Sequence, residues 1–442
     1  MNTSTSRKRT LAIIGLFYGL TGLGDSLIWQ LISNWQTYFY LPPDGEALIP
    51  VGVLYGVLMT LNATIDVLIT IPVGYWSDRF RTRWGRRLPW MFLSGLPRLL
   101  FFILLWFPPD KTMSLKNLLY LTIVMVAHGT ITGFQQVPCN ALLPELARDE
   151  QDRLTISAWG GSMRLLGLVL SGLAGLTIDR WGYHNTMLGY AAVSLALFYL
   201  PFLVLREPKA SPASSQRLGI RQSFLLTLKN RAFLIISAIH ALSVSSRVLI
   251  QTVFPFIVTE ILLLATGDTT YFYIVGLVAS FAAYPLVPWL SKKWGKRRAF
   301  AGTLLVAALI LPGLLFLGDW IPLPLFALGL LWVILEAVAL AGNSALEGIF
   351  IAEIIDRDAE VVGERREGMY YAAMDSVDSI VYSVIAMIPP LLLLLGRSHT
   401  DSSGPLGIRL VGVVGGVMAF LALLVFRLYP AQKAAAPAEG VS

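Results

Sequence analysis

The sequence predicts an all-α membrane protein with twelve transmembrane helices arranged as two parallel six-helix repeats. The chain is 55% hydrophobic and only 14% charged, so most of its surface must face lipid rather than water. Its apolar segments run for about 20 residues or more, the helix length that crosses a bilayer, without the alternation that a membrane-spanning strand requires. A basic motif in the first half recurs in the second half, which indicates an internal duplication.

Each predicted helix is an apolar segment that ends where charged, Gly or Pro residues begin. The first span follows Arg7, Lys8 and Arg9 and is too long for the core of a signal peptide, so we expect it to remain as a helix. Spans two to six follow after polar connections, and a longer segment containing Pro and Ser then separates them from six further spans. The predicted spans cover residues 11–40, 48–75, 88–107, 117–142, 155–178, 187–205, 233–262, 270–290, 299–317, 324–354, 369–396 and 407–427.

Basic residues are concentrated on one side of this arrangement. An even number of spans places both termini on the same side, and most of the 34 Lys and Arg residues fall in the connections on that side. This asymmetry follows the positive-inside rule, so we expect both termini in the cytoplasm and the chain in the plasma (inner) membrane. The net charge of +7 therefore reflects topology, and no nucleic-acid partner is expected.

The sequence offers little for metal or enzyme chemistry. The single cysteine, Cys139, excludes an intramolecular disulfide and a cysteine-rich metal site. His128 and His240 are separated in sequence from each other and from acidic residues, so no metal site is predicted. No nucleophile and base pairing, phosphate loop or cofactor motif is found, and we expect neither an enzyme nor a bound cofactor.

The chain divides into two halves of six spans. The sequence around Trp84 recurs around Trp294, 210 residues later, and the two loops then lie on the same, cytoplasmic, face of two parallel repeats. We expect an N-terminal bundle over residues 1–205, a cytoplasmic linker over 206–232, a C-terminal bundle over 233–427 and a disordered cytoplasmic tail over 428–442.

The connection between the second and third spans holds a basic motif that can act as a conformational latch. Its glycine lets helices approach closely, its acid can accept hydrogen bonds at a helix end, and the arginines that follow can bridge to a neighbouring helix. The alternative is that the arginines only fix the topology by staying inside. The expected cytoplasmic gate consists of Gly74, Asp78, Arg83, Gly85, Arg86 and Arg87.

A set of motifs runs in order through both halves, at Asp66, Gly74 and Asp78 and at residues 83–87, 89–90, 138–146, 289–298, 352–356 and 363–368. These motifs resemble those of the glycoside, pentoside and hexuronide cation symporters, a major facilitator family to which melibiose permeases belong. The resemblance implies a twelve-helix fold whose two halves rock about a site near the bilayer midplane, and transport of a sugar together with a cation.

Ionisable residues inside the spans are the candidates for function because charge within a bilayer is costly. The resemblance implies that Asp25 binds sugar hydroxyls, and Trp29, one turn onward, can cover the apolar face of a sugar ring. The alternative for Asp25 is an ion pair with Arg247 or Arg164 that only ties the halves together. The expected substrate-binding residues are Asp25, Trp29, Gln136, Arg164 and Arg247.

The resemblance also implies a cation-binding carboxylate at Asp66. Asn62 and Thr70 share its helix face at a spacing of four residues. Three charges of the melibiose-permease pattern are replaced, by Thr70, Gln136 and Ser379, so proton coupling, Na⁺ coupling and uncoupled facilitation all stay open.

Two acids on the eleventh span, Asp375 and Asp378, complete the coupling candidates. They either take over the role of the missing carboxylates or pair with Arg164 across the bundle. On the tenth span, Glu336 and Asn343 form a polar stripe that we assign to hydrogen-bonded packing. The expected coupling residues are Asp66, Asn62, Thr70, Asp375 and Asp378.

Together these features predict a monomeric secondary active transporter that moves a small polar, sugar-like solute by alternating access, coupled to H⁺ or Na⁺. One alternative is a lysophospholipid or amphiphile transporter of the same fold, with Arg164 or Arg247 holding a phosphate. Another is a non-transporting membrane receptor or assembly factor. The replaced charges favour this last reading, whereas the acids retained inside the spans argue against it.

Overall fold

The computed structural model describes residues 2–43, 47–50, 53–79, 82–147, 150–207, 220–318, 322–362, 367–393, 395 and 406–430. The first half contains α1 (Asn2–Tyr40), α2 (Val53–Arg79), α3 (Leu88–Leu104), α4 (Leu115–Leu146), α5 (Glu150–Gly172), α6 (Ala174–Tyr199) and η1 (Leu200–Leu203). The second half follows a short helix, α7 (Ile220–Lys229), and contains α8 (Arg231–Phe256), η2 (Ile257–Ile261), η3 (Thr266–Asp268), α9 (Thr269–Ala283), α10 (Leu286–Trp294), α11 (Lys296–Ile310), η4 (Leu311–Phe316), α12 (Leu325–Val362), α13 (Glu367–Ile385), α14 (Ile388–Leu392) and α15 (Leu406–Arg427).

The all-helical prediction is confirmed, and each predicted span corresponds to one helix or one interrupted pair. Within the described residues, nine helical stretches are long and apolar enough to cross a membrane. The three remaining predicted spans correspond to α2, to the shorter apolar helix α3, and to α9 with α10. Residues 208–219 of the expected linker and 431–442 of the expected tail lie outside the described part of the chain.

Several helices extend beyond the spans predicted for them. α1 begins at Asn2 rather than near residue 11, and Arg7 in its first turns pairs with Asp152 of α5 at 3.0 Å. α12 runs to Val362, so most of the segment expected as a loop after Glu353 is helical. A helix can continue past the membrane because its backbone groups stay hydrogen-bonded while its charged side chains reach water or a partner.

Other helices are interrupted where the sequence predicts an unbroken span. α5 ends at Gly172, inside the span predicted over 155–178, whereas the break at Gly182, with a φ of +74°, falls in the connection predicted between the fifth and sixth spans. Pro285 and Pro389 lie at the breaks between α9 and α10 and between α13 and α14. Proline lacks a backbone N–H and clashes with the preceding turn, so it ends or kinks a helix even inside an apolar segment.

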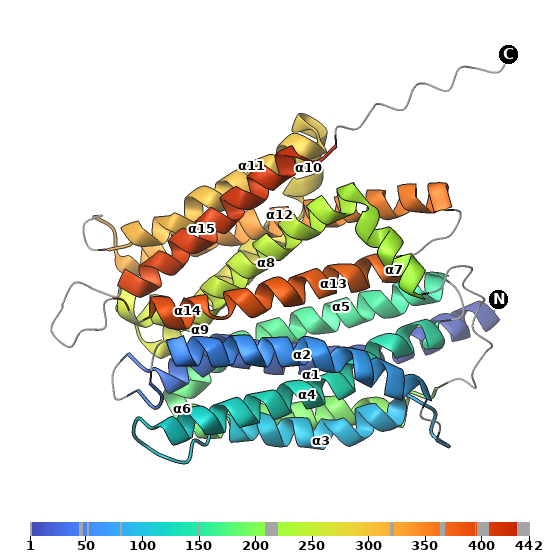
Figure 1. Ribbon diagram of the computed structural model, residues 1–442, viewed down its shortest axis with the longest axis horizontal. Coiled ribbons are helices and arrows are strands. Elements are labelled where there is room, and N and C mark those ends of the chain that lie inside the picture. Colours follow the sequence, from blue (N-terminus) through green and yellow to red (C-terminus); the bar gives the residue numbers. More distant parts are fainter. Residues whose placement is uncertain are drawn as a thin grey trace.

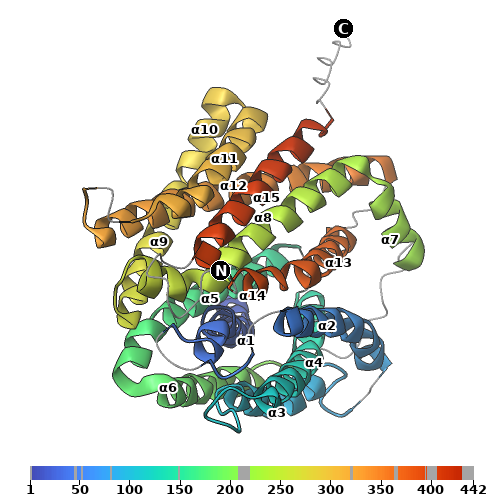
Figure 2. The same cartoon turned by 60° about the vertical axis from the view of Figure 1, so that its left-hand side comes forward.

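The two halves meet through helices that occupy equivalent places in the repeats. α1 contacts α8, α2 contacts α13, and α5 contacts α9. The second helix of each half therefore packs on the fifth helix of the other, as a twofold relation between parallel repeats requires. Figure 1 shows α1 to α4 and α6 gathered in the lower part and α8, α11, α12 and α15 in the upper part, and Figure 2 shows α13 beside α2.

We call the end of the bundle that holds Arg86 and Lys296 the basic face, and the end where α1 and α8 finish the opposite face. The halves are packed together toward the opposite face. There the Tyr38 hydroxyl donates to Thr259 Oγ1 at 3.2 Å, and the Tyr38 ring lies 4.7 Å from that of Phe256. The Leu176 N–H donates to Thr270 Oγ1 at 3.2 Å, also across the two halves.

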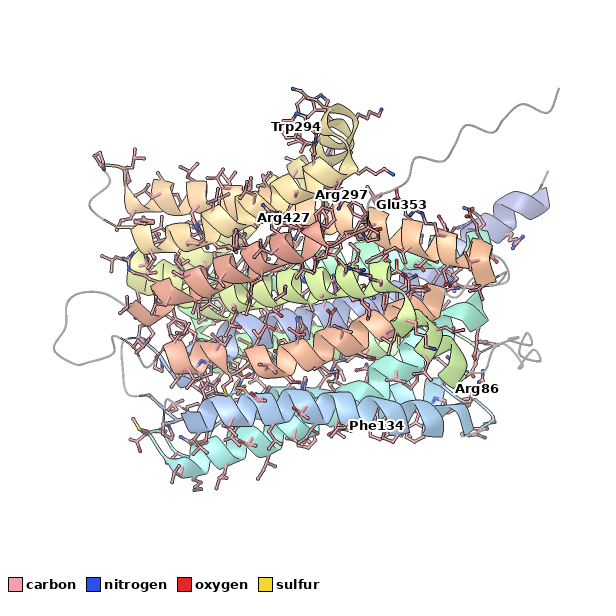
Figure 3. The ribbon with its side chains drawn as sticks, turned by 45° about the horizontal axis from the view of Figure 1, so that its top comes forward. Arg86, Phe134, Trp294, Arg297, Glu353 and Arg427 are labelled. Carbon is pink, nitrogen blue, oxygen red and sulfur yellow. The ribbon has the colours of Figure 1, made fainter. Side chains whose placement is uncertain are left out.

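Each half carries a basic loop with a positive-φ glycine at the basic face, and Figure 3 labels Arg86 in the first loop and Trp294 at the second. Gly85 and Gly295 both have positive φ, at +110° and +80°, where a residue with a side chain is strained. The residue after each glycine pairs with an acid of a neighbouring helix, Arg86 with Glu145 in the first half and Lys296 with Glu353 in the second.

The two loops differ in how they are tied to the last helix of their half. In the first half, the Glu207 carboxylate accepts from the backbone N–H groups of Arg86 and Arg87, each at 2.9 Å. In the second half, the Arg297 guanidinium donates to the backbone carbonyl of Tyr429 at 2.6 Å. Each basic motif therefore fastens helices within its own half.

The two glycines make a matched pair for a stability test. Both Gly85→Ala and Gly295→Ala place a side chain at positive φ, which costs about 1–3 kcal/mol. A Cβ at Gly85 would also lie 2.1 Å from Glu207 Oε2, whereas a Cβ at Gly295 meets nothing within 4 Å. We expect Gly85→Ala to lower the thermal unfolding temperature clearly more than Gly295→Ala, as measured in detergent; equal decreases would show that the Glu207 contact does not stabilise the loop.

Candidate functional site

A polar cavity of about 240 Å³ lies inside the first half, between α1, α3, α4 and α5. Asp25 belongs to the middle of α1, fifteen residues before its end at Tyr40, or about 22 Å along the helix axis. The cavity is therefore within the membrane-spanning part of the bundle. Its lining consists of Tyr18, Thr21, Gly22, Asp25, Arg98, Gln135, Gln136, Cys139, Asn140, Gly160 and Arg164.

Asp25 is held by two partners from neighbouring helices. Arg98 Nη2 of α3 lies 2.5 Å from Asp25 Oδ1, and Gln136 Nε2 of α4 donates to Asp25 Oδ2 at 2.6 Å. The Asp25 side chain remains 24% exposed to the cavity. Since each carboxylate oxygen has two lone pairs, Asp25 can still accept hydrogen bonds from a bound solute.

Arg98 is the residue that sequence reasoning did not assign to this site. Its side chain is only 2% exposed, its Nη1 donates to Gln135 Oε1 at 2.8 Å, and its guanidinium lies 5.2 Å from the Phe198 ring. From the sequence, Asp25 was expected to bind the solute or to form an ion pair with Arg247 or Arg164. The sequence does contain one indication of this partnership, the depth of each residue in the membrane. Arg98 and Gln136 each lie ten residues from the basic-face end of their helix, α3 and α4, and so fall at the same level of the bundle.

Arg164 of α5 extends its exposed side chain into the same cavity and makes no ion pair with any residue that the structure describes. The charge of Asp25 is already balanced by Arg98. The ionised side chains that line this cavity therefore leave one positive charge uncompensated.

A second cavity of about 440 Å³ lies between the halves, where α1 and α5 face α8, α9 and α12. Trp29 and Arg247 line it, together with Glu336 and mainly apolar side chains. The five expected substrate-binding residues are therefore divided, with Asp25, Gln136 and Arg164 around the first cavity. Trp29 also lies near Tyr382 of α13, with a distance of 6.2 Å between ring centroids.

The expected coupling residues of α2 are placed only in part. The structure does not describe the side chains of Asp66 and Thr70 on α2 or of Asp375 on α13. The gate positions Gly74 and Asp78 also lie outside the described side chains. Asn62 is described, and it is 5% exposed. Neither its amide oxygen nor its amide nitrogen has a hydrogen-bond partner among the described residues. A buried amide in this state costs about 1–3 kcal/mol unless a ligand, ion or water satisfies it.

The remaining coupling candidate, Asp378, lies in a cluster that the sequence did not predict. Asp378 Oδ2 is 2.8 Å from His240 Nε2, and His240 Nδ1 contacts the Glu347 carboxylate. His240 is separated from acidic residues in sequence, but α12 and α13 bring two carboxylates to it in space. Asn343 on the tenth span donates to Ser243 Oγ at 3.0 Å, consistent with the expected packing role.

Of the expected gate residues, Arg86 and Arg87 are brought together on Glu145, with Arg87 Nη2 at 3.0 Å from Glu145 Oε1. Arg83 is exposed. Across the described part of the chain, no group of three or more His, Cys, Asp or Glu side chains is arranged to hold a metal ion.

Residues 17–433 match the family model described as MFS/sugar transport protein. The chain is 23% identical over 304 residues to the isoprimeverose transporter of Lactiplantibacillus pentosus, covering 66% of this chain and 61% of that protein. It is 24% identical to the putative glycoside/cation symporter YagG of Escherichia coli (strain K12), covering 52% and 51%. It is 23% identical to the glucuronide carrier protein homolog of the same organism, covering 85% and 84%. The match thus spans less than two thirds of the first two of these relatives.

Solved structures resemble the whole chain. A bacterial homologue of the human lysosomal transporter Spinster, in an inward-facing and unoccupied conformation, has a TM-score of 0.67 at 13% identity and covers 96% of both chains. The nucleoside transporter NupG has a TM-score of 0.63 at 12% identity and covers 94% of this chain and 98% of that one. These likenesses confirm the expected fold.

The buried pair of Arg98 and Asp25 can be tested by a double-mutant cycle. Arg98→Met leaves the Asp25 carboxylate without its counter-charge, so we expect a loss of about 3–5 kcal/mol in unfolding free energy. Adding Asp25→Asn removes the unpaired charge and should recover part of that loss. Arg164→Met, which removes an exposed arginine from the same cavity, is the control and should change stability little. Unfolding in detergent is measured for the wild type, the single variants Arg98→Met and Asp25→Asn, the double variant and the control, and independent, additive effects at 98 and 25 would contradict the coupling.

Proposed function

The chain belongs to the MFS/sugar transport protein family, and from this premise we propose that it is a secondary active transporter of a small polar, sugar-like solute. The observation that carries the proposal is the polar cavity around Asp25 within the membrane-spanning bundle. The protein works by alternating access as a monomer in the plasma (inner) membrane, with both termini cytoplasmic. It has no enzymatic activity and no bound cofactor.

The lining of the first cavity suits a solute with several hydroxyl groups. Asp25 offers acceptor lone pairs, and Asn140 and Arg164 offer donors at the same cavity. The relatives named an isoprimeverose transporter and a glycoside/cation symporter support a sugar-like solute for this chain as well. The uncompensated charge of Arg164 further favours a solute that carries a carboxylate or sulfonate group, because an anion would balance it.

The packing of the halves supports a state that is closed at the opposite face and opens toward the basic face. The contacts of Tyr38 with Thr259 and of Leu176 with Thr270 seal the opposite face, which the positive-inside rule places outside the cell. In this proposal, the Arg86, Arg87, Glu145 and Glu207 contacts keep the first half rigid while it rocks against the second. The gate formed with Gly74, Asp78, Arg83 and Gly85 thus acts by holding helices within one half.

Cation coupling is proposed to involve Asp66 and its helix face. Asn62 supports this role because its buried amide has no hydrogen-bond partner among the described residues and can give an oxygen to Na⁺ or to a water near a protonated acid. Thr70 lies on the same face of α2. Relatives named as cation symporters support co-transport of an ion, with H⁺ and Na⁺ as the two choices.

One observation favours transport of an amphiphile as a second candidate. The second cavity lies at the junction of α5 and α9, is lined mainly by apolar side chains, and also presents Arg247. An acyl chain with a phosphate headgroup would match this lining. A non-transporting receptor role would instead leave both cavities unused.

The deciding experiment is uptake by proteoliposomes of the purified full-length protein. The panel contains neutral sugars, acidic sugars and a lysophospholipid, each with and without imposed Na⁺ and H⁺ gradients. We expect uptake of a sugar-like solute, strongest for an acidic one, driven by one of the two gradients. Uptake of the lysophospholipid alone would favour the amphiphile function, and uptake of nothing by folded protein would favour the receptor role.

Two substitutions separate solute binding from coupling. Asp25→Asn removes a solute acceptor, and we expect at least a tenfold loss of solute counterflow. Asp66→Asn should keep counterflow but abolish accumulation against a gradient. Asp179→Asn, an exposed acid, is the charge-matched control and should transport like the wild type. Full gradient-driven accumulation by Asp66→Asn would remove Asp66 from the coupling mechanism.

A further inference from the structure

Three helices of the second half meet at a histidine that lies between two carboxylates. His240 of α8 faces Glu347 of α12 through Nδ1 and Asp378 of α13 through Nε2, the latter at 2.8 Å. Glu347 is nearly buried, with 6% of its side chain exposed, and Asp378 is 21% exposed. One turn further along α8, Ser243 accepts a hydrogen bond from Asn343, which joins α8 to α12 again.

The number of protons in this cluster follows from the two nitrogen–oxygen contacts of His240. A neutral imidazole carries one N–H, and its other nitrogen presents a lone pair. Between two carboxylates, a neutral His240 would bring that lone pair against a carboxylate oxygen at one of the two contacts. Both contacts become attractive ion pairs when both ring nitrogens are protonated. The placement of the two carboxylates therefore points to an imidazolium.

Among the described residues near the cluster, no other positively charged side chain is placed to balance the Glu347 and Asp378 carboxylates. Of the elements packed on α8, α14 has no ionisable residue, and α15 has charged residues only at Arg409 and Arg427 near its two ends. α1 meets α8 through a hydrogen bond between Gln30 and Gln251. On α8 itself, Arg247 is two turns away, about 10 Å along the axis.

Further ionisable residues of these elements lie at other positions. α7 carries Arg221 and Lys229, which precede α8 at the basic face, whereas His240 lies nine residues inside α8, about 13 Å along its axis. On α13, Asp375 lies one turn before Asp378, and its side chain is outside the described residues. On α12, Glu336 lines the second cavity, three turns from Glu347.

We propose that His240, Glu347 and Asp378 form a proton-binding site in the second half, and that this site takes part in proton coupling together with Asp66 of the first half. The coupling role rests on the proposed transport function, whereas proton binding does not. Loss of the proton would make one nitrogen–oxygen contact repulsive and would leave two negative charges inside the bundle, which is costly there. The α8, α12 and α13 contact must then loosen.

Weaker packing among these three helices would also change the contacts between the two halves. α13 packs on α2, and α8 packs on α1, so two of the three helices joined by His240 also contact the first half. A proton at His240 can therefore bias how the halves pack, which is what coupling requires. The two carboxylates lie on opposite sides of the imidazole ring, so the three groups cannot converge on one Na⁺ or other metal ion.

Nitrogen-15 NMR of histidine-labelled protein in lipid nanodiscs tests the proton site directly. The chain has only four histidines, and the His240 signal is identified by its absence from His240→Gln. We expect a doubly protonated imidazolium at pH 7.5. Glu347→Gln should leave a neutral ring protonated on Nε2, facing Asp378, whereas Asp378→Asn should leave one protonated on Nδ1, facing Glu347. A neutral His240 in the wild type, or the same tautomer in both variants, would overturn the proton site.

Transport measurements test the coupling role separately. We expect His240→Gln to lose at least tenfold in accumulation driven by a pH gradient while retaining solute counterflow within twofold, with His184→Gln as an exposed control. Accumulation retained in full by His240→Gln would overturn the coupling role. If the wild type transports no solute at all, the NMR result still decides the proton site, and the failure then belongs to the proposed function.

Discussion

A charge inside a lipid bilayer must find its counter-charge or its hydrogen bonds within the protein, and this constraint organises the interior of the bundle. In the first half, Arg98 and Gln136 satisfy Asp25 from two different helices. These contacts link α1, α3 and α4 at one depth. They also set what a solute meets on entering, because the partners of Asp25 leave part of its acceptor capacity facing the cavity.

The repeated basic loops apply the same principle outside the membrane. Gly85 and Gly295 both have positive φ, and each is followed by a cation that pairs with an acid from a neighbouring helix. Because these pairs lie within one half, they stiffen each repeat and leave the junctions of α2 with α13 and of α5 with α9 to change. The halves can then move as units, as a rocking mechanism needs.

The span pattern could be predicted from the sequence because hydrophobic length is a local property that the bilayer thickness fixes. The break at Pro285 was missed because the segment around it stays apolar on both sides. The partner of Asp25 was missed for a different reason. A helix that is apolar nearly all round has no sequence signal for its rotation about its own axis, so the side chains it turns toward Asp25 are decided by packing. The same applies to His240, whose two acids come from helices more than 100 residues away.

The amide at position 136, where the family resemblance implies an acid, distinguishes the solute site of the first half from the cluster of the second half. The Gln136 nitrogen donates to Asp25 at 2.6 Å, where a second carboxylate would instead repel it and would need a cation or a proton between the two groups. An amide removes that need, so the first half can hold its solute site without binding a cation beside Asp25. In the second half the arrangement is reversed, because two carboxylates converge on one imidazole and are stable together only when a proton is present. The described contacts therefore require a proton in the second half and no cation beside Asp25, so protonation of His240 and binding of a solute at Asp25 can affect one another through the packing of the halves.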